Sequence, residues 1–559
     1  MRPEHAELLT DAVREECVRQ GGAAARRAWI GALAGAYEGA KRAAELGGAV
    51  RAAGTWYTPE PLVHWILDEA MPAQPGRAFR AVDPACGTGN FLLAIARRLR
   101  AAGVPAAQVA HAVHGMDLDP MAAAIARVRL EMEIGGGAAA WRASIRAGDA
   151  LAAGAWKGGW TVDLVAGNPP FLGQLSAATA RAGDARAALR ERFGGAVTRY
   201  ADQAAAFLLL GTELSGPRGV VAMVQPISVL AAGDAERVRG ACMQAGALDA
   251  VLFPRAGTFG AAVHTCVPVL RRGMRAGAVR ACAADGTVVR VAAIRGSAWS
   301  AALAAVRGVP EPGAERTRGT IGDHAQATAD FRQHYYGLRG RVIDAPKATR
   351  RAGEHALVTV GAIDAAGCTW GRTPVRLHGR ALLAPVVRAK AIENDPVLGP
   401  WLKARRGPKL LVATQTRAIE AFVDAAGAFL PSTPVVTVKP RRSADLWRVG
   451  AALLAPSTAA LAWQRHGGAA LSPGALRVSA RQLMELPAPG DARAWANGAA
   501  ALRAWQRAPG SRDAAARFAA RMCDAYGVPT AARAGLVAWW TQAIGPIGPK
   551  RSQAGAGRR

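Results

Sequence analysis

The 559-residue sequence is short of acidic residues, with 41 Asp and Glu against 70 Lys and Arg. The formal net charge is therefore +29. The balance predicts an anionic partner and favours nucleic acid.

Cysteine is scarce as well: there are seven, and no two of them form a Cys-x-x-Cys pair. No segment reaches the roughly 20 uncharged apolar residues of a membrane span. The N-terminal region carries Asp11, Arg14, Glu15 and Glu16 where a signal peptide would need an apolar stretch. We therefore expect a cytoplasmic protein in a reducing compartment, with no membrane contact.

Several families of nucleotide-driven enzymes are excluded by missing motifs. The glycine-bearing segment Asp83–Asn90 is not a phosphate-binding P-loop, because no Lys-Ser/Thr pair follows Gly89. Helicase and ATPase motifs are absent, and no internal repeat stands out. The stretch before Asp83 is also too short for a nuclease domain.

The segment around Asp83 has the pattern of a strand, a loop and a helix. Phe79–Val82 is a short apolar strand, and a helix is expected from Phe91. This is the first unit of a doubly wound α/β fold. Gly87 and Gly89 allow the backbone to come close to a ligand. The carboxylate of Asp83 disfavours phosphate and favours a cation, an amino group or a ribose.

Acidic residues also follow the next two predicted strands. His111–Met116 ends at Asp117, about where such folds bind ribose hydroxyls, whereas Asp119 is expected to cap the following helix. A third predicted strand ends near Asp149.

Thr58 precedes Pro59 at the start of another predicted helix. We expect Thr58 to be the N-cap, with Pro59 in the first helical position. A hydroxyl at a helix N-terminus suits a ligand carboxylate. The alternative is an ordinary capped helix without a ligand.

The most specific stretch is Asn168-Pro169-Pro170-Phe171, which follows a predicted buried strand at 162–165. Consecutive prolines stiffen the loop and remove backbone donors, so the loop presents acceptors. The Asn side chain adds a carbonyl oxygen, and the Phe adds a flat apolar face. Such a loop can hold an exocyclic amine by its two hydrogens while the attached ring stacks on the Phe. The alternative is a proline-bounded turn with a Phe packed in the core.

In chain order, the motifs Tyr-Thr-Pro, Asp-Pro-Ala-Cys-Gly-Thr-Gly, Gly-x-Asp-x-Asp-Pro, Gly-Asp-Ala and Asn-Pro-Pro-Phe resemble those of S-adenosylmethionine-dependent N6-adenine DNA methyltransferases of the gamma class. The resemblance covers most of the chain and extends to the modification enzymes of type I and type IIG systems. It implies S-adenosyl-L-methionine as the cofactor, double-stranded DNA as the substrate, and restriction or phage-defence proteins as partners. Asn-Pro-Pro followed by an aromatic residue also occurs in other methyltransferases. An RNA or protein-glutamine N-methyltransferase, or a DNA-binding protein with an inactive methyltransferase fold, therefore remain alternatives.

The same resemblance implies roles for individual residues. Asn168 and the Pro169 carbonyl would accept the two N6 hydrogens, with Pro170 and Phe171 completing the catalytic loop, and no metal is required. Phe259 would form the second face of the base pocket, unless it is an ordinary core residue. The residues expected to bind the cofactor are Thr58, Asp83, Ala85, Cys86, Gly87, Gly89, Asp117 and Asp149.

The expected fold class is a doubly wound, mostly parallel α/β methyltransferase sheet followed by an α+β target-recognition domain. The expected segments are an N-terminal helical segment (1–50), the methyltransferase domain (51–275), a connecting region (276–350), the target-recognition domain (351–490), C-terminal helices (491–545) and a disordered basic tail (546–559).

Two further features of the second half suit contact with DNA. Residues 331–337 form an aromatic-basic cluster, which fits either nucleic acid or a linker packed on the first domain. The basic residues expected near phosphates are Arg405, Arg406, Lys409, Arg417, Lys439, Arg441 and Arg442.

Overall fold

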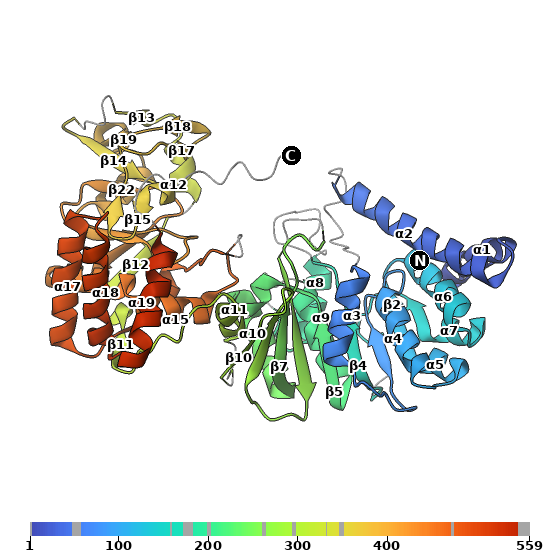
Figure 1. Cartoon of the computed structure of the whole chain (residues 1–559). Helices are drawn as coiled ribbons and strands as arrows, with labels where there is room; N and C mark the ends of the chain where they lie inside the picture. Colours follow the sequence, from blue (N-terminus) through green and yellow to red (C-terminus); the bar gives the residue numbers. More distant parts are fainter. Residues whose placement is uncertain are drawn as a thin grey trace. The chain divides into compact units, whose positions relative to one another are not determined.

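The computed structural model describes residues 3–46, 58–156, 159–171, 183–197, 203–259, 264–292, 294, 298–330, 332–345, 351–470 and 474–545. Tyr57 and the expected tail at 546–559 lie outside them. The chain forms two compact units, Met1–Ala302 and Leu303–Arg559, which appear as the blue-to-green and the yellow-to-red parts of Figure 1. None of the described helices is long and apolar enough to cross a membrane.

The first unit is built on a ten-stranded sheet in the order β10-β9-β7-β8-β5-β4-β1-β2-β3, with β6 paired to β8. The strands are β1 (Ala81–Asp83), β2 (Val113–Asp117), β3 (Ile145–Ala147), β4 (Val162–Gly167), β5 (Ser215–Met223), β6 (Gln225–Pro226), β7 (Gly246–Phe253), β8 (Thr265–Arg272), β9 (Val279–Ala283) and β10 (Val288–Val291). β1 pairs in parallel with both β2 and β4, whereas β8 is antiparallel to β5 and β7. β2 and β3 lie on one side of β1 and β4 lies on the other, so the strand order reverses at β1, the usual position of a ligand crevice in doubly wound folds. The expected fold class is confirmed for this unit.

Helices cover this sheet and also form the N-terminal segment. They are α1 (Pro3–Arg19), α2 (Ala23–Leu46), α3 (Glu60–Ala70), α4 (Asn90–Ala101), α5 (Ala106–Ala112), α6 (Pro120–Ile134), α7 (Ala138–Ser144), α8 (Gly183–Arg192), α9 (Gln203–Leu214) and α10 (Glu236–Ala245). The next helix, α11 (Ser300–Val306), spans the boundary between the two units. α1 and α2 pack on α6 through a cluster that includes Cys17, Ile30, Ile125 and Val128. The N-terminal helices thus cover α6, on one side of the sheet domain.

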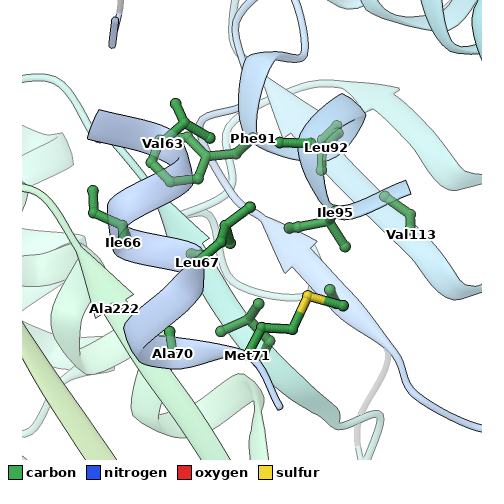
Figure 2. Close-up of a cluster of buried hydrophobic side chains, with 14 of the residues drawn as sticks. Val63, Ile66, Leu67, Ala70, Met71, Phe91, Leu92, Ile95, Val113 and Ala222 are labelled. Atoms are coloured by element: carbon green, nitrogen blue, oxygen red, sulfur yellow. The ribbon is translucent and has the colours of Figure 1, made fainter. Parts of the chain in front are cut away.

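One large hydrophobic cluster fixes the loop between β1 and α4. Figure 2 shows Val63 and Leu67 of α3 directed toward Phe91 and Ile95 of α4, beside the sheet. These four side chains are at most 2 % exposed. Because both ends of the Asp83–Gly89 loop are held by this packing, the loop has a defined position at the edge of the sheet.

The second unit contains two four-stranded sheets and a group of C-terminal helices, which confirms the expected α+β class. One sheet has the order β12-β23-β20-β21 and the other β13-β19-β14-β22. Its strands are β11 (Thr317–Thr320), β12 (Ala325–Ala329), β13 (Val342–Asp344), β14 (Glu354–Val358), β15 (Ile363–Asp364), β16 (Gly367–Cys368), β17 (Val375–Leu377), β18 (Arg380–Leu382), β19 (Pro385–Arg388), β20 (Lys409–Val412), β21 (Ala421–Asp424), β22 (Phe429–Pro431), β23 (Val436–Pro440) and β24 (Pro487–Pro489). Its helices are α12 (Arg332–Gly337), α13 (Leu398–Arg405), α14 (Leu446–Leu454), α15 (Pro456–His466), α16 (Ala480–Met484), α17 (Ala492–Arg507), α18 (Arg512–Tyr526) and α19 (Thr530–Ile544).

Residues 276–350, which we expected to connect the two domains, are instead divided between them. β9 pairs in parallel with β7, and β10 pairs with β9, so both strands extend the first sheet. β12 and β13 pair with β23 and β19 of the second unit. Strand pairing assigns these residues to the two units, and such pairing cannot be seen in the local sequence.

Candidate active site

A cavity of about 490 Å³ lies at the carboxyl ends of the central strands of the first unit. Asp83 ends β1, Asp117 ends β2, Asp149 follows β3 and Asn168 follows β4, and all four line this cavity. The cavity lies where the strand order reverses, at β1. The structure therefore brings together the three carboxylates and the acceptor loop that the sequence singles out.

Most of the predicted site residues line the cavity. These are Thr58, Asp83, Ala85, Cys86, Gly87, Asp117, Asp149, Asn168 and Pro170. Cys86 is buried, and burial raises the pKa of its thiol well above the ordinary value. The Cys86 side chain is therefore a neutral apolar wall rather than a nucleophile.

The remaining predicted residues do not line the cavity. Phe171 is 9 % exposed and Phe259 2 % exposed, and both belong to the hydrophobic core cluster of the first unit. Pro169 is buried. Gly89 precedes α4 with a φ of 89°, and a Cβ there would lie 3.2 Å from the Cβ of Ala126. Gly89 therefore allows the backbone conformation and the close packing of the loop on α6. Contact of Phe171 or Phe259 with a base stays a prediction.

The capping role expected for Thr58 is wrong. α3 begins at Glu60, Pro59 occupies the N-cap position, and no side chain caps the helix. Proline has no N–H group and a fixed φ, so it can precede the first turn without a cap. Thr58 is nevertheless buried beside the cavity, which leaves it within the candidate site.

Asp83 is the most strongly perturbed carboxyl group in the cavity. It is 2 % exposed, and its Oδ1 accepts a hydrogen bond of 3.0 Å from the Ala85 N–H. Burial raises the pKa of Asp83 to about 8, although the Ala85 hydrogen bond acts in the opposite direction. A cation bound beside Asp83 would restore the ionised form.

Asp117 is held by two backbone groups. Its Oδ2 accepts from the Gly87 N–H at 2.7 Å, and its Oδ1 accepts from the Asp119 N–H at 2.8 Å. Burial raises the pKa of Asp117 despite these bonds. Each carboxylate oxygen keeps a second lone pair, so Asp117 can still accept from two neighbouring hydroxyls. Asp149 is oriented similarly, by the Leu151 N–H at 2.9 Å.

The N-terminal helix α2 contributes to this cavity, which the sequence did not indicate. Tyr37 and Lys41 line the cavity and donate to Oδ2 of Asp119, the Tyr37 hydroxyl at 2.6 Å. Burial acts to raise the pKa of Asp119, but these hydrogen bonds outweigh it and the pKa is lowered. Asp119 also accepts from the Met121 and Ala122 N–H groups, which confirms its predicted capping role.

Glu38 of α2 is bonded to the glycine loop itself. Its Oε1 accepts from the Thr88 hydroxyl and, at 3.2 Å, from the Asn90 amide. Thr88 is buried, and Asn90 also accepts a 2.7 Å hydrogen bond from Arg129. α2 is therefore attached to the loops that follow both β1 and β2.

Helix α9 supplies two more lining residues that the sequence analysis missed. Gln203 and Phe207 are four positions apart, so they share one face of the helix. The Oε1 atom of Gln203 is buried and has no hydrogen-bond partner within the described ranges. A buried acceptor in this state is expected where a ligand supplies the donor.

Most of the basic residues expected near phosphates in the second unit have partners within the protein. Arg442 pairs with Asp445 at 3.2 Å, and Arg441 and Lys439 donate to backbone carbonyls. Lys409 is fully buried and pairs with Asp424 at 2.7 Å, so its predicted role is wrong. Arg405 pairs at 2.7 Å with the buried Asp330. The exposed members of the predicted set are Arg406, Arg417, Arg441 and Arg442, and Lys439 is half-buried.

The sheet order, the antiparallel β8 and the cavity at β1, β2 and β4 define a methyltransferase-type α/β domain. Residues 32–292 match the family model described as N-6 DNA methylase. The glycine loop precedes the Asn-Pro-Pro-Phe loop, and a second unit follows both, as in the gamma class.

Several solved structures match parts of the chain. The chain is similar to the type IIL restriction-modification enzyme MmeI in complex with DNA, at 12% identity and a TM-score of 0.50, over 87% of this chain and 76% of that one. It also matches a modification subunit of a putative type I restriction enzyme from Vibrio vulnificus YJ016, at 18% identity and a TM-score of 0.37, over 47% of this chain. A type I methyltransferase subunit from Streptococcus thermophilus matches at 24% identity and a TM-score of 0.34, over 42% of this chain. Our chain covers about half of these two subunits, 52% and 48% respectively. No curated protein matches the sequence significantly.

Proposed function

We propose that the protein transfers a methyl group from S-adenosyl-L-methionine to N6 of a flipped-out adenine in double-stranded DNA. The observation that carries this proposal is the single cavity lined by both the acidic loops and the Asn168–Pro170 loop. A methyl donor and an amine held by these two sets of residues would lie within one space. Its volume of about 490 Å³ is in the range of small-ligand pockets.

The residues on the acidic side fit this cofactor. A carboxyl group at Asp83 suits the ammonium group, Asp117 suits the two ribose hydroxyls, and Asp149 suits the adenine amine. Thr58 would donate to the carboxylate. The buried acceptor of Gln203 provides a further contact for an N–H or O–H group. When bound, the cofactor supplies an activated methyl group on a sulfonium centre.

The residues on the other side fit an aromatic amine. The lone pair of adenine N6 is delocalised into the ring, which makes the amine a poor nucleophile. The Asn168 side-chain oxygen and the Pro169 carbonyl would each accept one N6 hydrogen and draw the nitrogen toward a tetrahedral geometry. Catalysis then comes from orientation and placed dipoles. The base must leave the duplex to reach this loop, and stacking on Phe171 and Phe259 would hold it there.

The second unit is proposed as the target-recognition domain, in a restriction-modification or phage-defence setting. Its exposed Arg406, Arg417, Arg441 and Arg442 are proposed phosphate contacts. With a net charge of +29, binding to duplex DNA should weaken steeply as salt rises, because counterions are released from DNA on binding.

The test is methyl transfer from labelled S-adenosylmethionine to genomic DNA taken from a host without adenine methylation. Digestion to nucleosides should give labelled N6-methyladenine, and base-resolution sequencing should place it at one sequence motif. Total RNA and denatured cellular protein serve as the alternative acceptors. Label in RNA or protein, with none in DNA, would contradict the proposed substrate.

A further inference from the structure

A short hairpin in the second unit is built for a fixed conformation. β17 and β18 pair as Val375↔Leu382, Arg376↔Ala381 and Leu377↔Arg380. The two residues of the turn, His378 and Gly379, have φ values of 51° and 80°. Positive φ at both central residues is the pattern of the type I′ turns that suit two-residue hairpins.

The base and the tip of this hairpin are both anchored. Leu377 and Leu382 are buried in a hydrophobic cluster of the second unit. At the tip, the His378 N–H donates to the Tyr335 hydroxyl at 3.2 Å, and the two rings meet edge to face with centroids 4.4 Å apart. Figure 1 shows α12, which carries Tyr335, beside the two strands. The hairpin therefore presents its remaining side chains from a rigid support.

Those remaining side chains are cationic and exposed. Arg376 and Arg380 are exposed, and neither guanidinium forms a hydrogen bond or an ion pair with any described residue. Arg339 is exposed as well, and its charge reaches His378, whose pKa is lowered first by burial and then by Arg339. Tyr336 is 61 % exposed beside Tyr335.

Three other arginines of the second unit have acidic partners instead. Arg341 pairs with Asp395 at 2.7 Å, Arg388 pairs with Glu354 at 3.3 Å, and Arg405 pairs with Asp330. Two unpaired guanidinium groups on one anchored hairpin leave their binding capacity for an external partner. A planar edge with two acceptors fits such a guanidinium fork, as do phosphate oxygens.

We propose that the hairpin at 375–382 reads base edges in the major groove of the target DNA, with Arg376 and Arg380 as guanine-contacting residues. This inference rests on the proposed function. The major groove admits a two-stranded ribbon, and an Arg fork fits O6 and N7 of guanine. Arg376 shares a face with Ala381 and Arg380 with Leu377, so the two arginines leave opposite faces of the ribbon and reach different base pairs. Tyr336 and Arg339 then face the neighbouring backbone.

The experiment compares three double variants of the full-length protein with the wild type. R376Q/R380Q removes both charges, and R376K/R380K keeps the charges but loses the bidentate fork. R512Q/R517Q removes two exposed charges from α18 as a matched control. For each protein we measure the melting temperature, the salt dependence of binding to duplex DNA, and the frequency of methylation at the cognate site against single-base variants of that site.

For R376K/R380K we expect wild-type salt dependence and melting temperature, but a loss of preference for the cognate site on the order of 10- to 100-fold at guanine positions. R376Q/R380Q should lose the same preference and bind more weakly, and R512Q/R517Q should match the wild type in preference. Unchanged preference in R376K/R380K would overturn the inference and make these arginines phosphate contacts. Methylation of DNA by the wild-type protein is measured first. If the wild type methylates no DNA, the proposed function itself is wrong.

Discussion

The carboxyl group of Asp83 lies against the backbone of Gly167, so closely that a Cβ at Gly167 would lie 2.3 Å from Oδ1 of Asp83. Asp83 belongs to the glycine loop and Gly167 ends β4, directly before the Asn168 loop. The absence of a side chain at Gly167 thus couples the position of the acidic loop to that of the acceptor loop.

Gly167→Ala is therefore expected to displace Asp83. Overpacking of a tight site destabilises a protein by about 1–3 kcal/mol, so the melting temperature should fall. Affinity for S-adenosylmethionine, measured by calorimetry, should fall with it. Gly240→Ala in α10 is the matched control, because a Cβ at Gly240 meets no atom within 4 Å. Equal affinities of the two variants would show that Asp83 is not constrained by Gly167.

Cofactor affinity should depend on pH through Asp83, whose pKa is raised to about 8. The folded protein keeps this proton between about pH 4 and pH 8, where the unfolded chain has lost it, so this group makes folding less favourable as pH rises through that window. A bound ammonium group favours the carboxylate, so binding releases the proton below pH 8. Affinity should therefore increase as pH rises from 6 to 8, by at most about tenfold per unit.

The proton can be counted directly by calorimetry in buffers of different ionisation enthalpy. Asp83→Asn should bind more weakly and lose most of the pH dependence. If Asp83→Asn keeps the wild-type slope, the released proton belongs to another group, for which Asp117 is the nearest candidate because its pKa is also raised.

The attachment of α2 to the glycine loop predicts a role for Glu38 in cofactor binding. Glu38→Ala removes the acceptor of the Thr88 and Asn90 hydrogen bonds. Hydrogen bonds to charged groups contribute about 1.5–3 kcal/mol, so the loop should be less well ordered without cofactor. We expect faster amide exchange across 86–90 and a KM for S-adenosylmethionine raised about tenfold, with kcat at saturation little changed.

Glu15→Ala removes an exposed carboxylate from α1 and serves as the control for net charge. Its exchange rates and KM should match the wild type. A Glu38→Ala protein that loses stability throughout, with uniform acceleration of exchange, would indicate that α2 supports the fold rather than the loop.

Sequence could predict the acidic loops because each signal is local. Asp83, Asp117 and Asp149 each follow a predicted strand, and parallel strands bring their carboxyl ends together. The contact of Glu38 with Thr88 spans 50 positions, so no local pattern reveals it. Lys409 shows the opposite error: its charge suggested a surface, but β20 is an inner strand and Asp424 is its direct cross-strand partner. Tertiary structure likewise decides whether an aromatic ring packs in the core or lines a cavity. Phe171 and Phe259 both pack in the core cluster.

The catalytic proposal depends most directly on Asn168. Asn168→Ala removes one of the two acceptors proposed for the N6 hydrogens, and we expect a loss of turnover on the order of 10²-fold or more. Asn168 lies at the end of β4, only partly buried and facing the cavity, so the melting temperature should change little. Phe171→Ala makes a different prediction, because Phe171 is a core residue at 9 % exposure and its truncation should destabilise the protein by about 3–5 kcal/mol.

Single-turnover rates on a duplex with a mismatch opposite the target adenine separate the two roles. The mismatch lowers the cost of flipping the base, so it should restore part of the activity lost through weaker stacking. It cannot replace an acceptor for N6, and Asn168→Ala should stay slow on this duplex. A conservative Phe171→Leu variant keeps most of the packing and allows the comparison at normal stability. Full activity of Asn168→Ala on an ordinary duplex would remove the proposed chemical step, because the Pro169 carbonyl alone would then suffice.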